Sequence, residues 1–313
     1  MAKFYRKIRA PFERGAVHAV MALIPRLPRY GVLGLARFGG WAGYCFDGRG
    51  RRIGQANLDV VFGGTKSPAE KKAILKTSFV TMARTLLDTF WFAHKSAERL
   101  KAYVDVDETS SQVFIEDKAH ICITAHFGNW EIIGQMSGYL GHPLSSIATP
   151  VKNKAVNKHF IRAREATGQT IIPRAGALRK LIKVLRTGGK TAFLADQNTN
   201  ETEGGIWIDC FGVPAPVTAA PAVLSGRTGT DILIGFCVPQ PGGRYRAYAA
   251  EHFSPPETVN EETVRELTEK INAVLEREIL KTPQYWLWMY KRWKDKKEGD
   301  ESADYPFYSQ RVS

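Results

Sequence analysis

Short apolar segments alternate with amphipathic segments through the middle of the chain, and this alternation limits the fold more than any other feature. The expected strands lie at residues 121–125, 144–149, 170–173 and 191–195, and the expected helices between them at 129–140, 153–167 and 175–186. Strands that alternate with helices are joined by crossover connections. The pattern therefore predicts an α/β fold with a mostly parallel or mixed central sheet flanked by helices.

Further segments extend this core at both ends. A long amphipathic helix is expected at 68–93, where Ser67 suits the N-cap and Glu70 the N3 position of a capping box. A short helix at 221–227, a hairpin of strands at 232–238 and 245–250 and a helix at 259–280 are also expected. No linker is long or polar enough to separate two domains. We expect one α/β domain at 53–297, preceded by an anchor at 1–52 and followed by a loose charged tail at 298–313.

The first 52 residues are basic and apolar together. They carry eleven Lys and Arg side chains but only two acidic ones, around apolar stretches at 16–25 and 30–46. Neither stretch reaches the ~18–20 apolar residues of a spanning helix. The pattern predicts membrane-associated helices that lie in or dip into the interface, where Trp41 and Tyr44 are well suited. The alternative is a helical hairpin packed on the protein core.

The net charge of the chain favours an anionic partner. Lys and Arg number 44 against 31 Asp and Glu, a formal charge of +13. Nucleic acid, anionic lipid and an acidic protein would all be attracted. The four cysteines are widely spaced and form no C-x-x-C, which argues against a disulfide framework or a zinc ribbon. There is no G-x-S-x-G or H-E-x-x-H, and GGKT at 188–191 fails as a phosphate loop because Val184 replaces its first glycine.

The segment ICITAHFGNWEIIG combines a strand, a turn and a helix. His126 comes just after the strand, at the edge where α/β sheets bind ligands, and Glu131 falls in the first helical turn. A carboxylate there can turn back to the imidazole and fix its tautomer, while Gly128 permits a close backbone approach. This predicts a base and its orienting partner, with the nucleophile supplied by a substrate hydroxyl. The alternative is a helix-capping Glu131 and a buried, satisfied His126.

Several ordered blocks resemble the late acyltransferases of lipid A biosynthesis and their relatives that acylate phosphatidylinositol mannosides. The blocks are the H-x4-[D/E] motif from His126 to Glu131, Asn57-Leu58 with Phe62, Lys152-Asn153 with Asn157, Arg164 and Gly168, Asp196-Gln197, and the tryptophan-rich segment from Trp286 to Lys294. The resemblance covers nearly the whole chain. Tyr290 departs from it, since the family often has His at that place.

The resemblance implies a glycerolipid-acyltransferase α/β sandwich and the transfer of a fatty acyl group from an acyl thioester to a lipid hydroxyl. His126 would deprotonate the hydroxyl, and Glu131 would orient and stabilise the imidazole. The donor would be acyl carrier protein or acyl-coenzyme A, and the acceptor a lipid A precursor or related glycolipid. No metal or redox cofactor is needed. The expected location is the cytoplasmic face of a bacterial inner membrane, on an anionic surface, with no nucleic acid partner.

The same resemblance suggests substrate-binding residues. Arg164 and Arg174 are candidates to pair with a phosphate of the acceptor or of the phosphopantetheine arm, unless they are merely solvated or salt-bridged. Asp196 is a candidate second partner for His126 or a holder of a basic group, and its bland alternative is a loop cap. The remaining candidates are Gln197, Lys152 and Asn129.

Three other points stay open at this level. The aromatic run 286–293 fits either core packing or an interfacial patch. A membrane-associated binding protein that has lost turnover is an alternative to the enzyme. A basic nucleic-acid-binding protein is a further alternative, and it would show steeply salt-dependent binding to any duplex.

Overall fold

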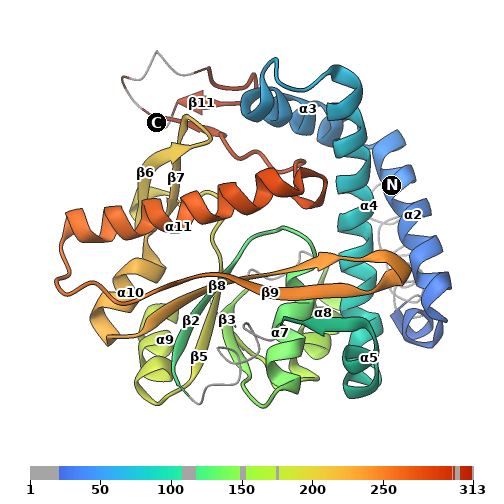
Figure 1. The fold of residues 1–313 in the computed structure, drawn as a ribbon, viewed down its shortest axis with the longest axis horizontal. Helices are drawn as coiled ribbons and strands as arrows, with labels where there is room; N and C mark the ends of the chain where they lie inside the picture. Colours follow the sequence, from blue (N-terminus) through green and yellow to red (C-terminus); the bar gives the residue numbers. More distant parts are fainter. Residues whose placement is uncertain are drawn as a thin grey trace, which may run out of the picture.

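A computed structural model describes residues 21–107, 118–148, 153–173, 176–297, 299 and 304–311. A seven-stranded sheet forms the centre of the fold (Figure 1). From one edge to the other its strands are β1 (Val104–Val106), β9 (Tyr245–Phe253), β8 (Asp231–Pro239), β2 (His120–Thr124), β5 (Lys190–Leu194), β3 (Leu144–Ile147) and β4 (Thr170–Ile172). Every neighbouring pair is parallel except the β8–β9 hairpin, as expected for an α/β fold.

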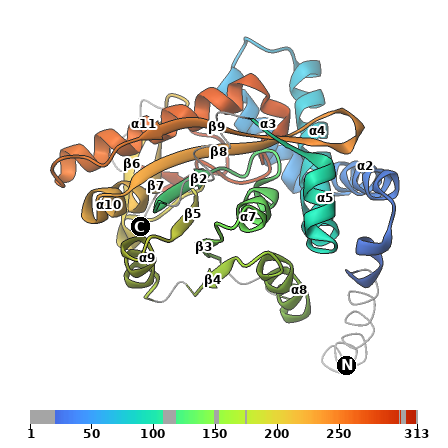
Figure 2. The ribbon, with the colours of Figure 1, turned by 60° about the horizontal axis from the view of Figure 1, so that its bottom comes forward.

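Helices cover both sides of this sheet, as predicted. They are α2 (Arg29–Phe46), α3 (Gly48–Phe62), α4 (Pro68–Ala93), α5 (Ser96–Tyr103), α7 (Trp130–Tyr139), α8 (Lys154–Glu165), α9 (Ala177–Arg186), α10 (Ala220–Thr228) and α11 (Glu261–Lys281). Short 3-10 helices are η1 (Ile24–Arg26), η2 (Glu201–Glu203), η3 (Pro241–Gly243) and η4 (Pro283–Tyr285). Figure 2 shows α11 on one side of the central strands and α7 on the other.

The alternation of side chains along the central strands explains this layering. Ile121 and Ile123 of β2 lie in one apolar cluster with residues of α11. On β8, Cys237 belongs instead to a second cluster with Ile132 and Ile133 of α7. Successive strand residues point to opposite faces, so a strand covered on both sides must be apolar throughout. The two clusters hold β2 and β8 at the centre of the fold.

Two small sheets were not expected from the sequence. β6 (Gly205–Cys210) and β7 (Val213–Thr218) form an antiparallel pair, and β10 (Asp295–Lys296) pairs with β11 (Gln310–Arg311). Pro214 and Pro216 lie within β7, and proline argues against a strand because it cannot donate to a ladder. The hairpin tolerates both because β6 is the only strand that pairs with β7 among the described residues, and the other edge of β7 carries just an isolated bridge between Asn198 and Val217.

From residue 21 on, the N-terminal region packs against the α/β body. Helix α2 lies beside α4 in both views (Figures 1 and 2). At Gly40 a Cβ atom would come within 2.4 Å of the Cα of Val80, so the two helices approach closely. The expected division between residues 52 and 53 falls inside α3. Among the described residues, no helix has the length and apolar character needed to cross a bilayer.

The outward side of α2 is nonetheless aromatic. Tyr30, Phe38, Trp41 and Phe46 are 79%, 65%, 57% and 83% exposed. We call these four residues the aromatic face of α2. Its opposite side is buried against the protein at Val32 and three other positions, so α2 contacts the core and also presents apolar surface outward. Packing of α2 on the core, one interpretation of the sequence, is therefore compatible with a place at a membrane interface, the other interpretation. Residues 1–20 lie outside the described part.

The prediction of a loose C-terminal tail is wrong for residues 304–311. Tyr308 is buried, and its hydroxyl donates to the side-chain oxygen of Asn57. The backbone N–H of Gln310 donates to the carbonyl of Lys294 at 2.8 Å. The charged residues before this segment suggested a loose tail, but the buried Tyr308 packs residues 304–311 onto α3.

Candidate active site

His126 and Asp196 meet because β2 and β5 are parallel neighbours. Thr124 pairs with Leu194 at the ends of the two strands, so the residues two positions further along emerge at the same edge of the sheet. The His126 Nδ1 and the Asp196 Oδ1 are 2.9 Å apart. Of the two functional roles considered for Asp196, a partner of His126 or a holder of a basic group, the structure shows the contact with His126.

The Asp196 carboxylate is buried and held from two sides. Its second oxygen accepts a hydrogen bond from the Trp286 indole N–H at 2.8 Å. Burial raises the pKa of this carboxyl, but the charge of His126 and the hydrogen bonds from His126 and Trp286 outweigh burial and hold the pKa below its ordinary value. An ionised Asp196 only accepts hydrogen bonds, so the proton of a neutral His126 lies on Nδ1 and Nε2 keeps its lone pair.

Gln197 lies at the other nitrogen of the same ring. Its side-chain nitrogen is 3.4 Å from the His126 Nε2. At this length the contact is a weak hydrogen bond. The structure therefore brings Gln197 to the same site as His126 and Asp196. Its amide lies beside Nε2, the ring nitrogen that Asp196 does not contact.

The expected contact between Glu131 and His126 is wrong. Glu131 instead accepts two hydrogen bonds from Arg164, at 2.9 Å to Nε and 2.6 Å to Nη2. Burial lowers the pKa of Arg164, but the hydrogen bonds and charge of Glu131 outweigh it, and the pKa is raised. Glu131 faces α8 from the first turn of α7, and the planar guanidinium matches both of its oxygens.

Trp130 connects the two carboxylate pairs. Its ring meets the His126 ring edge to face, with the centroids 4.9 Å apart. Its indole N–H is 3.2 Å from a Glu131 oxygen and donates to it. Glu131 thus reaches His126 only through an intervening aromatic ring.

The turn that carries His126 is fixed by neighbouring elements. Gly128 has φ of 62°, and a Cβ there would lie 2.2 Å from the carbonyl oxygen of Cys237. The predicted close approach at Gly128 therefore exists, and it is to β8. The Thr85 hydroxyl donates to the Gly128 carbonyl at 3.0 Å, and the Leu287 N–H donates to that of His126 at 3.0 Å. A side chain at position 128 would force the turn off β8.

Asn129 is placed differently from the other substrate-binding candidates. It is fully buried and caps α7, with its side-chain oxygen accepting from the N–H of Ile132 at 3.3 Å. Its amide nitrogen donates to the hydroxyl of Tyr245 at 3.0 Å. Each polar atom of this fully buried side chain has a partner inside the protein, so the contacts of Asn129 are structural, and its predicted substrate-binding role stays a prediction. Lys152 and Arg174 lie outside the described residues.

The tryptophan-rich segment packs in the core, one of the two interpretations considered. Trp288 and Trp293 are fully buried, and Trp286 is 3% exposed. The side chain of Asn57 donates to the carbonyls of Trp288 and Tyr290 at 2.7 Å each. The bond from Trp286 to Asp196 was not predicted, because it joins residues 90 positions apart. The Asn57 block therefore holds the tryptophan-rich block in place, and Trp286 of that block in turn holds Asp196.

Among the described residues, one group of side chains has donor atoms close enough to hold a metal ion. His120, Asp231 and His252 offer ligand atoms within 4.8 Å of one another. His120 and Asp231 begin the parallel strands β2 and β8, so this group lies at the edge opposite His126. The Lys118 ammonium is 2.8 Å from Asp231 and provides a positive charge there. A metal at this place would not touch the His126 ring.

A cavity of about 290 Å³ lies between the start of the described chain, the end of α4 and α8. Met21, Phe90 and Ala163 contribute apolar surface to it, whereas Arg26 and Arg162 contribute positive charge. Ala163 precedes Arg164 in α8, so the cavity borders the helix whose Arg164 side chain pairs with Glu131. This lining suits an amphipathic, anionic molecule.

The fold and site define an α/β protein with a histidine–carboxylate pair at the carboxyl edge of a parallel sheet, an arrangement suited to removing a proton from a hydroxyl. Comparison with known families gives a more specific result. The chain belongs to the family described as bacterial lipid A biosynthesis acyltransferase, whose model matches residues 1–295. Membership of this acyltransferase family implies an acyl donor and a lipid acceptor.

Individual relatives are distant. The chain is 24% identical over 260 residues to a lipid A biosynthesis palmitoleoyltransferase of Escherichia coli K12, covering 81% of this chain and 82% of that protein. It is 25% identical over 205 residues to a phosphatidylinositol mannoside acyltransferase of Mycolicibacterium smegmatis, covering 64% and 67%. A crystal structure of the 1-acyl-sn-glycerophosphate acyltransferase PlsC from Thermotoga maritima matches with 18% identity and a TM-score of 0.36, covering 74% of this chain and 97% of that one. That score is too low to support an argument.

Proposed function

We propose that the protein transfers a fatty acyl group from an acyl thioester to a hydroxyl of a lipid A precursor or a related glycolipid, with His126 as the general base. One observation carries this proposal beyond the family assignment. Asp196 holds Nδ1 of His126 at 2.9 Å, so Nε2, which has only the weak contact with Gln197, keeps its lone pair for a substrate at the sheet edge where α/β folds bind ligands. The intact pair also argues against a binding protein without turnover.

The proposed reaction balances without a protein nucleophile. The acceptor hydroxyl gives its proton to the His126 Nε2 as its oxygen attacks the thioester carbonyl carbon. The tetrahedral intermediate collapses, the carbon–sulfur bond breaks, and the leaving thiolate takes the proton from the imidazolium. The Asp196 charge stabilises that imidazolium and keeps its ring in place. The products are a lipid ester and a free thiol.

For Glu131 we propose a role through Arg164. The Arg164 side chain is 23% exposed, and Glu131 holds two of its nitrogens in a fixed plane. A guanidinium fixed in this way suits a phosphate, either on the acceptor or on the phosphopantetheine arm of the donor. The neighbouring cavity, with Arg26 and Arg162 in its lining, suits the same kind of lipid.

We further propose that the protein works on the cytoplasmic face of a bacterial inner membrane, with the aromatic face of α2 in the lipid interface. Tyr and Trp favour that depth, and the exposed Arg37 and Arg49 suit anionic headgroups. The net charge of +13 would attract either an anionic membrane or an acidic acyl carrier protein. Acyl carrier protein and acyl-coenzyme A are both candidate donors.

The test is acyl transfer by the purified full-length protein. Labelled acyl–acyl carrier protein and labelled acyl-coenzyme A are each offered with a lipid A precursor, and the wild type is compared with His126→Ala and His142→Ala. We expect transfer by the wild type and by His142→Ala, a control in the turn after α7, and none by His126→Ala. Equal transfer by His126→Ala would overturn the mechanism, and no transfer by folded wild type with either donor would overturn this choice of substrates.

A further inference from the structure

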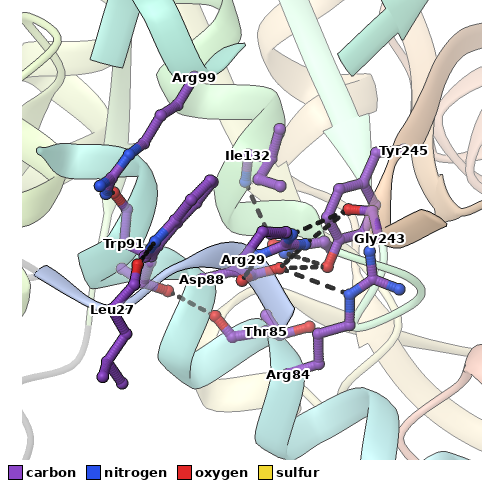
Figure 3. A network of polar contacts seen from close by, with 12 residues as sticks. Leu27, Arg29, Arg84, Thr85, Asp88, Trp91, Arg99, Ile132, Gly243 and Tyr245 are labelled. Carbon is purple, nitrogen blue, oxygen red and sulfur yellow. Dashed lines mark hydrogen bonds and ion pairs between the residues drawn. The ribbon is translucent and has the colours of Figure 1, made fainter. Parts of the chain in front are cut away.

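A buried polar network connects α2 with the turn that carries His126 (Figure 3). Its centre is Asp88 of α4, whose side chain is fully buried. Arg29 of α2 pairs with both Asp88 oxygens, and its Nη2 is 3.0 Å from Oδ2. Arg29 also donates to the carbonyl of Gly243 at 2.7 Å. One ion pair therefore joins α2, α4 and the turn between β8 and β9.

A second cation faces the same carboxylate. The Arg84 Nε lies 3.5 Å from the Asp88 Oδ2, one helical turn away. The Arg84 guanidinium also lies over the ring of Tyr245, 4.1 Å from its centroid. Two cations therefore flank the Asp88 carboxylate in a place where an isolated one would be costly. With both of its oxygens paired to cations, Asp88 is the acceptor at the centre of the network, and this determines the direction of the hydrogen bonds around it.

Tyr245 connects Asp88 to Asn129 by hydrogen bonds that run in one direction. Its hydroxyl is 2.5 Å from the Asp88 Oδ2 and donates to it, because both Asp88 oxygens accept from the flanking arginines. Burial first, and then the charge of Asp88, raise the pKa of Tyr245, which keeps the phenol protonated. Its remaining lone pairs accept from the Asn129 amide nitrogen at 3.0 Å. The chain of donors therefore runs from Asn129 to Tyr245 to Asp88.

This direction fixes which way the Asn129 amide points. With its nitrogen toward Tyr245, its oxygen faces the N–H of Ile132 and caps α7. The backbone N–H of Asn129 donates to the carbonyl of Cys237 at 2.7 Å, so the same residue holds the turn against β8. Reversal of the amide would point two donors at each other at the cap and would set the amide oxygen against the lone pairs of the Tyr245 hydroxyl, an acceptor facing an acceptor.

We propose that Tyr245 and Asp88 are positioning residues for the reaction, because they orient Asn129 and through it the turn that presents His126. The proposal rests on the proposed function, since it assumes that His126 is the base. Neither residue reaches the reacting atoms, and both act only through Asn129. Because Arg29 of α2 pairs with Asp88 of α4, the network also depends on the packing of α2 against α4.

The test uses two equivalent substitutions on one strand. Tyr245→Phe removes the hydroxyl of the network and keeps the ring. Tyr248→Phe, three positions along β9, removes a hydroxyl that donates to Glu278 at 3.1 Å and lies outside the network. We expect Tyr245→Phe to lower kcat about 10- to 100-fold with KM changed less than 3-fold, because a small displacement of a catalytic group costs rate more than binding. Tyr248→Phe should retain the wild-type kcat.

A double variant separates positioning from loss of stability. Serine also caps helices, without needing Tyr245 as an acceptor. If Tyr245 acts through Asn129, Tyr245→Phe should lower kcat less than 3-fold when it is added to Asn129→Ser. A full 10-fold or greater loss in that background, or equal losses of kcat in Tyr245→Phe and Tyr248→Phe, would overturn the proposal.

Amide hydrogen exchange tests the network without any activity, which separates its failure from failure of the proposed function. Residues 126–135 should exchange at least 5-fold faster in Tyr245→Phe than in the wild type, and Tyr248→Phe should leave their exchange unchanged. Unchanged exchange in Tyr245→Phe would overturn the positioning role even in a protein that transfers no acyl group. Faster exchange with wild-type kcat would overturn it as well.

Discussion

The imidazole of His126 is held by Asp196, a residue 70 positions further along the chain, through a 2.9 Å contact at Nδ1. The acidic residue of the H-x4-E motif makes no such contact. Its carboxylate lies on Arg164 instead. The two carboxylates of the site therefore differ in what they hold, and substitutions at each should have different kinetic effects.

Asp196→Asn should lower kcat by about 10³-fold or more while KM changes little. The amide presents a donor or a neutral acceptor to Nδ1, so the imidazolium loses its counter-charge and the ring loses its fixed tautomer. Steady-state transfer assays at saturating donor measure the effect. Asp105→Asn, at an exposed ion pair with Arg244, is the matched control and should retain wild-type kcat. A loss of less than 10-fold in Asp196→Asn would contradict the assigned partnership.

Glu131→Gln should act mainly on KM. It weakens the pair with Arg164 but leaves the bond between His126 and Asp196 in place. We expect KM for a phosphorylated acceptor to rise about 10-fold, with kcat reduced far less than in Asp196→Asn. Assays that vary acceptor concentration distinguish the two parameters. Equal kcat losses in Glu131→Gln and Asp196→Asn would contradict this division and would indicate that Glu131 also orients His126.

The pH dependence of stability should reflect Asp196. Its pKa in the folded protein is depressed below the ordinary value of 3.8, so the stability it contributes is present above about pH 4 and lost as pH falls through the folded pKa. The difference in unfolding free energy between wild type and Asp196→Asn should be largest near pH 6 and shrink toward pH 3. Urea unfolding at several pH values measures it. A difference that grows on acidification would mean that burial, not the partners, determines this pKa.

Arg29→Met should destabilise the protein by about 3 kcal/mol, because it leaves the buried Asp88 with Arg84 as its remaining cation. Arg246→Met, at an exposed pair with Asp107, is the control and should cost about 1 kcal/mol or less. Denaturant unfolding of the two variants gives the comparison. Equal costs would show that Arg29 contributes no more than a surface ion pair.

Trp41→Ser should weaken binding to vesicles made of anionic and neutral phospholipids by about 10-fold, since it removes roughly 1.5–3 kcal/mol of apolar transfer free energy. Trp41 is 57% exposed on the aromatic face of α2, so the folded protein loses little packing. Vesicle co-sedimentation measures binding. Phe307→Ser is the control, because Phe307 is 68% exposed in the C-terminal tail. Equal weakening by both would argue against a specific role for α2.

Local signals in the sequence predicted most elements. The capping box of Ser67 and Glu70 marks the start of α4, and the helix begins at Pro68 as expected. The strands of the central sheet from β2 to β9 were recognised as short and mostly apolar or alternating segments bounded by turn residues. The pair β6–β7 was missed, since the prolines of β7 oppose the usual strand pattern.

The candidate site depended on information that no local pattern contains. Both His126 and Asp196 could be placed after strands, but which strands are neighbours is a property of the sheet order, with β5 next to β2. Proximity in sequence made Glu131 the obvious partner of His126, whereas Arg164, 33 residues away, holds it in the structure. Trp286 and Tyr245 support the site from still greater sequence distances.

The pairing of His126 with Asp196 depends on the register of two adjacent strands, each followed by a two-residue overhang. Insertions or deletions in the loops beyond those overhangs, such as the polar segment at 198–204, leave the separation of base and carboxylate unaltered. Changes in these loops therefore alter the surroundings of the site without changing the contact between His126 and Asp196.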